Sequence, residues 1–196
     1  MTNENYEIIE DVTQGVLHSA YVAAPFGEGK TALEAKGYRI PTLEENARLR
    51  IQEGGGSNVS RNGNWVSEDF VYVPSKGIYL TKKSPIMVNP REATEAHRNN
   101  IEYFLTDEQV QEALSDSIEV ESDQNSITAY AFGNFAKKYE EFLKENDISE
   151  MPVWLASMRD KSFARKVWFW GLDCRSGLRG NWGMGRGWDD RVRGVK

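Results

Sequence analysis

The sequence predicts an α+β fold, with short mixed or antiparallel sheets, two to four flanking helices and much irregular loop. Three observations predict it. Trp65 to Val73 alternates apolar and polar residues as a strand does, two capping boxes mark helix starts, and residues 134–146 carry an amphipathic pattern. We find no internal repeat and no linker that would divide the chain, so one α+β domain is the economical interpretation.

The N-terminal part predicts strands, followed by a string that is similar to a phosphate-binding loop. Residues 6–24 read as one or two short strands around Gly15. The following string APFGEGKT, Ala24 to Thr31, resembles a phosphate-binding loop, but that motif requires glycine where Ala24 stands. Gly37 and Pro41 also make the next segment a poor crossover helix, so nucleotide binding is not expected.

The first capping box predicts a helix from Thr42 to about Glu53. The Thr42 hydroxyl can accept from the amide of Glu45, whose carboxylate can reach back, and Gly54 ends the helix. After the turn at Asn62-Gly63, the strand of residues 65–73 is expected to pair with a second strand at Gly77 to Thr81.

The second half predicts three helices and a strand. Residues 90–105 contain a helix with His97 on its exposed or partly satisfied face, and the capping box Thr106 to Gln109 opens a second one reaching Leu114. Residues 115–128 are polar and acidic, which indicates a surface loop or an edge strand. Residues 134–146 form the third helix, and residues 152–156 form a strand.

The length and composition of the chain limit the functions that it can have. The chain of 196 residues is expected to form a single domain, residues 1–196. Its net charge of −6 argues against nucleic-acid binding, and its single cysteine, Cys174, excludes an internal disulfide. We find no apolar run long enough to span a membrane and no signal peptide, so synthesis in the cytoplasm is expected.

The C-terminal stretch, residues 163–196, has the most unusual composition. It holds four of the six tryptophans and, between Gly171 and Gly194, seven glycines. From Trp170 to Lys196, six Lys and Arg residues face three Asp residues. Tryptophan and arginine on a glycine-rich backbone are typical of binding surfaces, although the same tryptophans could fill the core of a small irregular domain.

Several short motifs in this chain resemble known families. Trp168 to Leu172 (WFWGL) and the later Trp188-Asp189-Asp190 are similar to elements of C-type lectin folds, and residues 37–42 (GYRIPT) resemble a segment of formylglycine-generating-enzyme relatives of that fold. The tail, from Phe163-Ala164-Arg165 to the closing string DRVRGV, resembles that of variable proteins of diversity-generating retroelements, and the preceding residues resemble their archaeal and viral members more loosely.

The resemblance implies a C-type lectin scaffold that displays a diversified ligand site at about residues 165–195, with no catalytic activity and no cofactor. A retroelement would copy the 3′ end of the gene with errors at adenines. The expected ligand is a protein or a cell-surface molecule, and the sequence leaves open whether the protein is displayed on a virion or a cell surface. The candidate variable, ligand-binding positions are Trp170, Asp173, Cys174, Arg175, Arg179, Asn181, Trp182, Met184, Arg186 and Trp188.

The same pattern implies invariant scaffold positions, which are Trp168, Leu172, Leu178, Val192 and Val195. Adenine errors in an asparagine codon that ends in C or T cannot produce Trp or Met, because both of those codons end in G. Trp182, Met184 and Trp188 therefore need other template codons or belong to the scaffold.

Three other functions remain open. An oxidoreductase of the formylglycine-generating type would need a cysteine pair with copper, and only Cys174 is present. Calcium-dependent sugar binding could use Asp189 and Asp190, but the Glu-Pro-Asn sugar motif is absent. A structural viral component with one fixed partner would explain the aromatic tail equally well.

Overall fold

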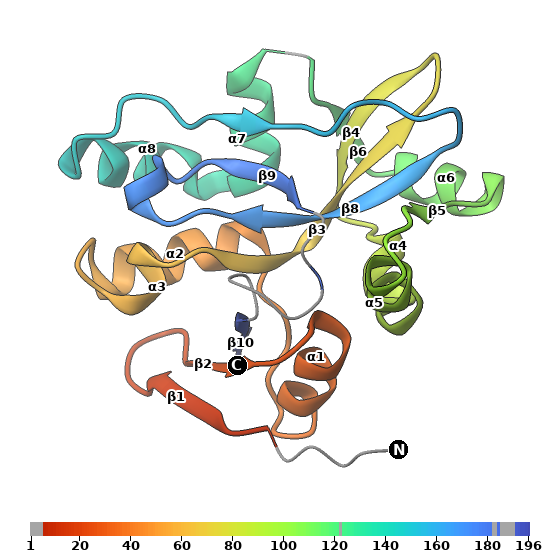
Figure 1. Ribbon diagram of the computed structural model, residues 1–196. Helices are drawn as coiled ribbons and strands as arrows, with labels where there is room; N and C mark the ends of the chain where they lie inside the picture. The colour runs from red at the N-terminus through yellow and green to blue at the C-terminus, as the bar shows by residue number, and fades with distance from the viewer. Residues whose placement is uncertain (1–5, 122, 182–183, 185–190) are drawn as a thin grey trace.

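The two ends of the chain meet in a small antiparallel sheet. The computed structural model describes residues 6–121, 123–181, 184 and 191–196. Strand β2 (Ser19–Ala23) lies between β1 (Ile8–Val12) and β10 (Arg191–Val195), and both neighbours run antiparallel to it. The expected strands on either side of Gly15 are thus confirmed, and Figure 1 shows this sheet below the larger one.

The larger sheet has the order β6-β4-β3-β8-β9-β7, with the short β5 also pairing with β8. The expected pairing of residues 65–73 with residues 77–81 is confirmed as an antiparallel β3–β4 hairpin. Strand β7, predicted over residues 152–156, contains only two residues and pairs in parallel with β9. The bounds are β3 (Asn64–Val73), β4 (Gly77–Thr81), β5 (Tyr103–Phe104), β6 (Ser117–Glu119), β7 (Val153–Trp154), β8 (Phe163–Phe169) and β9 (Leu178–Asn181).

More helices surround the sheets than the sequence predicted. The described part of the chain forms eight α-helices, two of them only four residues long, so the expectation of two to four is too low. They are α1 (Phe26–Glu34), α2 (Leu43–Glu53), α3 (Asn58–Arg61), α4 (Pro85–Val88), α5 (Pro90–Arg98), α6 (Asp107–Leu114), α7 (Gln124–Phe132) and α8 (Ala136–Glu145), with 3₁₀ helices η1 (Gly133–Phe135) and η2 (Leu172–Cys174).

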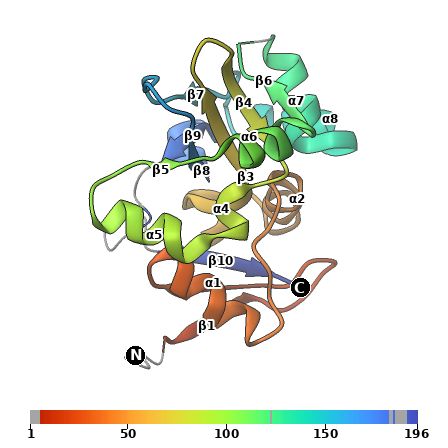
Figure 2. The same cartoon turned by 90° about the vertical axis from the view of Figure 1, so that its right-hand side faces the viewer.

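Helix α1 occupies most of the string that resembled a phosphate-binding loop, Ala24 to Thr31. Its glycines allow close packing: a Cβ on Gly29 would lie 2.6 Å from Cγ2 of Val192, and one on Gly27 would lie 3.1 Å from the carbonyl oxygen of Pro90. The phosphate-loop-like string therefore brings α1 against β10 and α5, and Figure 2 shows α1 beside α5.

The edge strand expected within residues 115–128 is confirmed as β6 at the edge of the larger sheet, whereas α7 begins at Gln124, inside the same segment. The side chain of Asp123 accepts from the amides of Asn125 and Ser126 at 2.6 and 3.3 Å, which caps the helix N-terminus. Ile127 and Phe132 then face the core. The capping residue Asp123 and the apolar residues Ile127 and Phe132 are visible in the sequence as a helix signal, but the polar residues around them favoured a loop or an edge strand.

The capping boxes predicted at Thr42 and Thr106 are both present, and both helices begin where expected. The helix predicted over residues 90–105 is shorter, because it ends at Arg98 and Asn100 then adopts a positive φ of 57°. The third predicted helix begins as η1 and continues as α8, with Tyr139, Phe142 and Leu143 buried.

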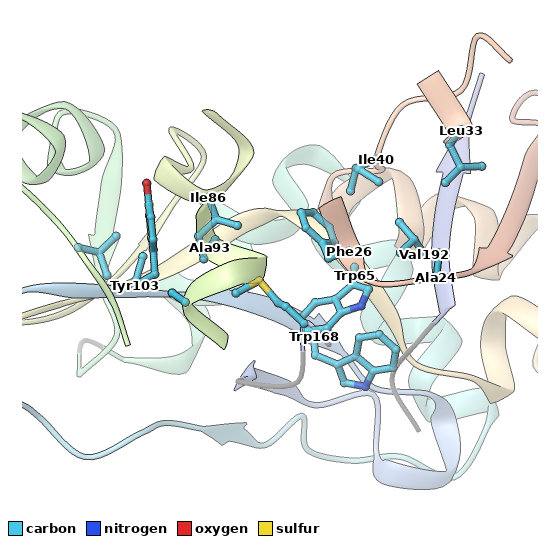
Figure 3. Packing of buried hydrophobic residues seen from close by; sticks show 14 of the residues in the cluster. Ala24, Phe26, Leu33, Ile40, Trp65, Ile86, Ala93, Tyr103, Trp168 and Val192 are labelled. Atoms are coloured by element: carbon cyan, nitrogen blue, oxygen red, sulfur yellow. The ribbon is translucent and has the colours of Figure 1, made fainter. Parts of the chain in front are cut away.

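Strands β3 and β8 lie at the centre and are buried on both faces. Alternate residues of β8 enter different clusters: Trp168 packs on one side with Trp65 and Phe26, whereas Val167 and Phe169 pack on the other. Figure 3 shows the first cluster, in which the rings of Phe26, Trp65 and Trp168 lie together. The C-terminal part of the chain therefore runs through the core before it reaches the surface.

Candidate binding surface

Three of the candidate positions line one surface hollow at the end of the larger sheet. The hollow has a volume of about 450 Å³, which falls within the range of small-molecule and side-chain pockets. Its lining comes from β7 and the residues after it, from β8, from the η2 loop and from β9. The lining residues are Trp154, Leu155, Ala156, Arg165, Trp170, Cys174, Arg179 and Gly180.

A chain of edge-to-face aromatic rings connects this hollow to the core. The ring of Trp154 lies 6.4 Å from that of Trp170, which lies 6.2 Å from that of Trp168. Trp168 in turn contacts Trp65 at 4.8 Å between centroids. Exposure falls from 42% at Trp154 to 4% at Trp168, so the two outer rings offer apolar surface while the inner rings fix their orientation.

Parallel pairing of β7 with β9 brings Trp154 beside Arg179, although 25 positions separate them in the sequence. Two glycines make this packing possible. A Cβ on Gly177 would lie 2.5 Å from Cζ3 of Trp154, and one on Gly180 would lie 2.5 Å from the hydroxyl oxygen of Tyr72. A larger side chain at either position would displace the wall of the hollow.

The loop of residues 171–177 forms one rim of the hollow. It is closed at its base by a hydrogen bond from the Trp170 amide to the Gly177 carbonyl at 2.9 Å and by one from the Ser176 amide to the Gly171 carbonyl at 3.0 Å. Arg175 and Ser176 both have a φ of 54°, a left-handed conformation that costs about 1–2 kcal/mol per residue. The surrounding contacts must therefore hold this loop in place.

The fully buried Arg50 of α2 supplies those contacts. Its guanidinium donates to the carbonyl oxygens of Trp170 and Phe169 at 2.8 and 3.1 Å and to the Ser176 hydroxyl at 2.7 Å. It also lies 3.8 Å above the ring of Phe169. Tyr139 of α8 hydrogen-bonds to both Arg50 and Ser176. Burial lowers the pKa of Arg50, and the nearby Tyr139 hydroxyl opposes that shift.

An ion-pair cluster holds Arg165, another residue that lines the hollow. Glu102, which is buried, accepts from Arg165 at 2.8 Å, and Arg159 lies 3.5 Å from the same carboxylate oxygen. Arg165 also donates to the carbonyl oxygen of Gly180 at 3.4 Å. The cluster thus fixes Arg165 against β9, whereas Arg179, which also lines the hollow, is exposed.

The predicted positions divide into three groups. Asp173, Cys174, Arg175 and Arg179 are exposed and Trp170 is half-buried, as a ligand-contacting surface requires. Asn181 and Met184 are only 5% and 2% exposed, so their side chains are not available to a ligand, and the burial of Met184 agrees with the alternative that it belongs to the scaffold. Trp182, Arg186 and Trp188 lie outside the described residues.

The two buried positions have clear packing reasons. Asn181 is the last residue of β9 and pairs in register with Lys166 in the middle of the sheet. Met184 joins the cluster that contains Trp65 and Trp168, and its carbonyl oxygen accepts from the amide of Phe26 at 3.3 Å. Of the scaffold candidates, Trp168, Leu178, Val192 and Val195 are buried as expected, and Leu172 is half-buried.

The sequence alone did not identify Trp154, Leu155, Arg165 or Arg50 as parts of this surface. A signal existed for Trp154 and Leu155, because consecutive residues of the strand predicted over residues 152–156 point to opposite faces, so a strand with one buried face would expose one of the two. For Arg50 there was none, since an arginine in an amphipathic helix usually faces solvent.

The structure also bears on calcium binding and on membrane insertion. Asp189 and Asp190, the possible calcium ligands, lie outside the described residues. Among residues 6–121, 123–181, 184 and 191–196, no cluster of three or more His, Cys, Asp or Glu side chains is arranged to hold a metal ion. Within the same residues, no helix has the length and apolar character needed to cross a membrane.

Comparison with known proteins gives a result at the level of fold. No protein-family model matches the sequence, and no curated protein matches it. A solved structure described as "Accommodation of massive sequence variation in Nanoarchaeota by the C-type lectin fold" superposes with a TM-score of 0.64, covering 94% of this chain and 99% of that one. Sequence identity is 17%. The α+β architecture and this superposition together show that the chain has the C-type lectin fold.

Proposed function

We propose that this protein is a ligand-binding protein whose C-terminal surface is diversified by a retroelement so that different copies recognise different targets. Residues 1–196 form one domain in this proposal, with the ligand region at about residues 165–195. The observation that carries it is the hollow beside β9, where exposed candidate positions stand on a backbone fixed from the core.

The arrangement separates variation from stability. Asp173, Cys174 and Arg175 project from a loop whose backbone is held by Arg50 and Ser176, and Arg179 projects from a strand paired on both sides. Substitution at these exposed positions removes little buried area, so the fold tolerates it. The matching structure is described as an accommodation of massive sequence variation by the C-type lectin fold. That description concerns the other protein, and it agrees with the proposal for this one.

The proposal assigns the chain no catalytic activity and no cofactor. The oxidoreductase alternative requires two cysteines, and the full sequence contains only Cys174. The ligand is then a protein or a cell-surface molecule, and the protein is displayed on a virion or a cell. The structural alternative, with one fixed partner, differs in requiring that the same surface be constant among gene copies.

Sequencing the 3′ end of this gene across its source population tests the proposal. We expect substitutions at codons 173, 174, 175 and 179, arising at template adenines, and constant codons for the buried residues Trp168, Leu178, Val192 and Val195. Codons of equally exposed residues outside the tail, such as Lys36 and Arg91, serve as a control for ordinary drift. A tail no more variable than these control codons would exclude diversification and favour the fixed partner.

A further inference from the structure

We propose that in this copy of the protein the hollow binds an acidic protein segment that inserts an apolar side chain between Trp154 and Arg179. This inference rests on the proposed binding function and specifies the ligand class. It is argued from the charge around the hollow, the unpaired arginines on it and the exposed apolar residues beside it.

The charge around the hollow is opposite to that of the whole chain. The two segments that line it, residues 154–165 and 170–180, contain five basic and two acidic residues, and the balance stays positive when Glu102, which pairs with Arg159 and Arg165, is included, whereas the chain carries a net charge of −6. A positive site on an acidic protein attracts an acidic partner and repels further basic surface, which gives both orientation and selectivity.

Two arginines at the hollow have guanidinium groups that are available to bind a ligand. Arg165 is occupied by Glu102, but Arg175 and Arg179 are exposed and form no ion pair with any residue that the structure describes. A guanidinium donates two parallel hydrogen bonds to a carboxylate, so an Asp or Glu side chain is the protein group that fits best. Arg179 lines the hollow together with Trp170, whose ring offers an apolar surface next to the charge, and Arg175 lies beside the lining residue Cys174 in the loop of residues 171–177.

Exposed apolar residues continue from the hollow along one segment. Trp154, Leu155 and Met158 are 42%, 37% and 39% exposed; Trp154 ends β7, and the other two follow it within four residues. Clustered exposure of this kind marks a contact surface more than isolated exposed residues do. A volume of about 450 Å³ admits one or two side chains of a partner.

A nucleic acid fits these observations less well. A polyanion needs a broad basic surface, and the rest of this chain is strongly acidic, so a long phosphate backbone would meet repulsion beyond the hollow. A short acidic segment with an apolar residue meets only the favourable region.

Selection from a random-peptide library displayed on phage, against the purified full-length chain, tests the inference. We expect the enriched peptides to be rich in Asp and Glu and to carry at least one aromatic or large aliphatic residue. Binding of the best synthetic peptide, measured by fluorescence polarisation, should weaken about tenfold or more in Arg179→Glu and in Trp154→Ala. The exposed Arg91 of α5 does not line the hollow, so Arg91→Glu, with the same charge change, should bind as the unmodified protein does.

The outcomes separate the ligand class from the site. Enriched peptides without acidic bias, but sensitive to Trp154→Ala, would overturn the acidic ligand and leave the hollow as the binding site. Binding that is unchanged in both hollow variants, or no enrichment at all, would overturn the site as well. Circular dichroism of each variant shows whether it remains folded.

Discussion

Charged side chains inside the sheet show how single residues shape this protein. Lys166 of β8 is fully buried, with its amine 2.7 Å from Asp69, 3.0 Å from the Ser84 hydroxyl and 2.8 Å from the Ser67 carbonyl. Burial lowers the pKa of Lys166, and the carboxylate of Asp69 opposes that shift. A buried pair with this many partners is costly to break, because one charge would remain without compensation.

Glu68 makes stability depend on pH. Burial raises its pKa to about 7, although hydrogen bonds from the backbone amides of Leu43 and Glu68 oppose the rise. The unfolded chain releases this proton near pH 4.5 and the folded protein holds it to about pH 7, so the folded state binds more protons between these values. The contribution of Glu68 to stability is therefore complete below about pH 4.5 and is lost as the pH rises through 7.

We expect the free energy of unfolding in urea to fall by about 2 kcal/mol between about pH 5 and pH 8 because of this group. Glu68→Gln keeps the shape and cannot ionise, so its unfolding free energy should vary less over the same range. Equal pH dependence in the two proteins would show that Glu68 does not titrate in this window.

At the scale of elements, the loop of residues 171–177 depends on two helices distant in sequence. Arg50→Met should lower the free energy of unfolding by about 3 kcal/mol, because several hydrogen bonds to a charged group are lost and two carbonyl oxygens stay buried. Hydrogen exchange at the amides of Cys174, Arg175 and Ser176, which close the loop, should accelerate.

Arg48 provides the matched control on the same helix. It is partly exposed and pairs with Glu44 one turn earlier, so Arg48→Met should change the unfolding free energy by less than about 1 kcal/mol. Exchange in the loop should then be unchanged. Similar loop exchange in both variants would mean that Arg50 does not hold the loop.

At the scale of the whole molecule, Arg193 ties the last strand to the first. It forms a two-pronged ion pair with Asp11 at 2.7 and 2.8 Å and also donates to Asn64 at 2.6 Å and to Asn58 at 3.0 Å. These contacts join the small sheet to the start of β3 and to α3. The arginine in the closing motif therefore serves the scaffold and is not available to a ligand.

Asp11→Asn should lower the free energy of unfolding by about 3 kcal/mol, since it leaves Arg193 buried with an incomplete set of partners. Glu34→Gln, which removes a surface pair with Lys30, should cost less than about 0.5 kcal/mol. Urea unfolding measures both. A loss at Asp11 as small as that at Glu34 would show that the pair does not hold the sheets together.

The sequence by itself determined the elements whose causes are local. The capping boxes at Thr42 and Thr106 act within four residues, the apolar stripe of α8 repeats along one helix, and the hairpin of β3 and β4 joins neighbouring segments. The motifs of the tail likewise predicted the C-type lectin fold. These features need no knowledge of distant residues.

Only the tertiary structure decided which residues reach the surface. Gly29 allows α1 to pack because Val192 lies against it, Met184 is buried by the cluster around Trp65, and Trp154 reaches the hollow because β7 pairs with β9. Exposure depends on contacts between segments far apart in the chain, and a linear pattern does not specify those contacts. The division of the tail into scaffold and binding surface is therefore a property of the fold.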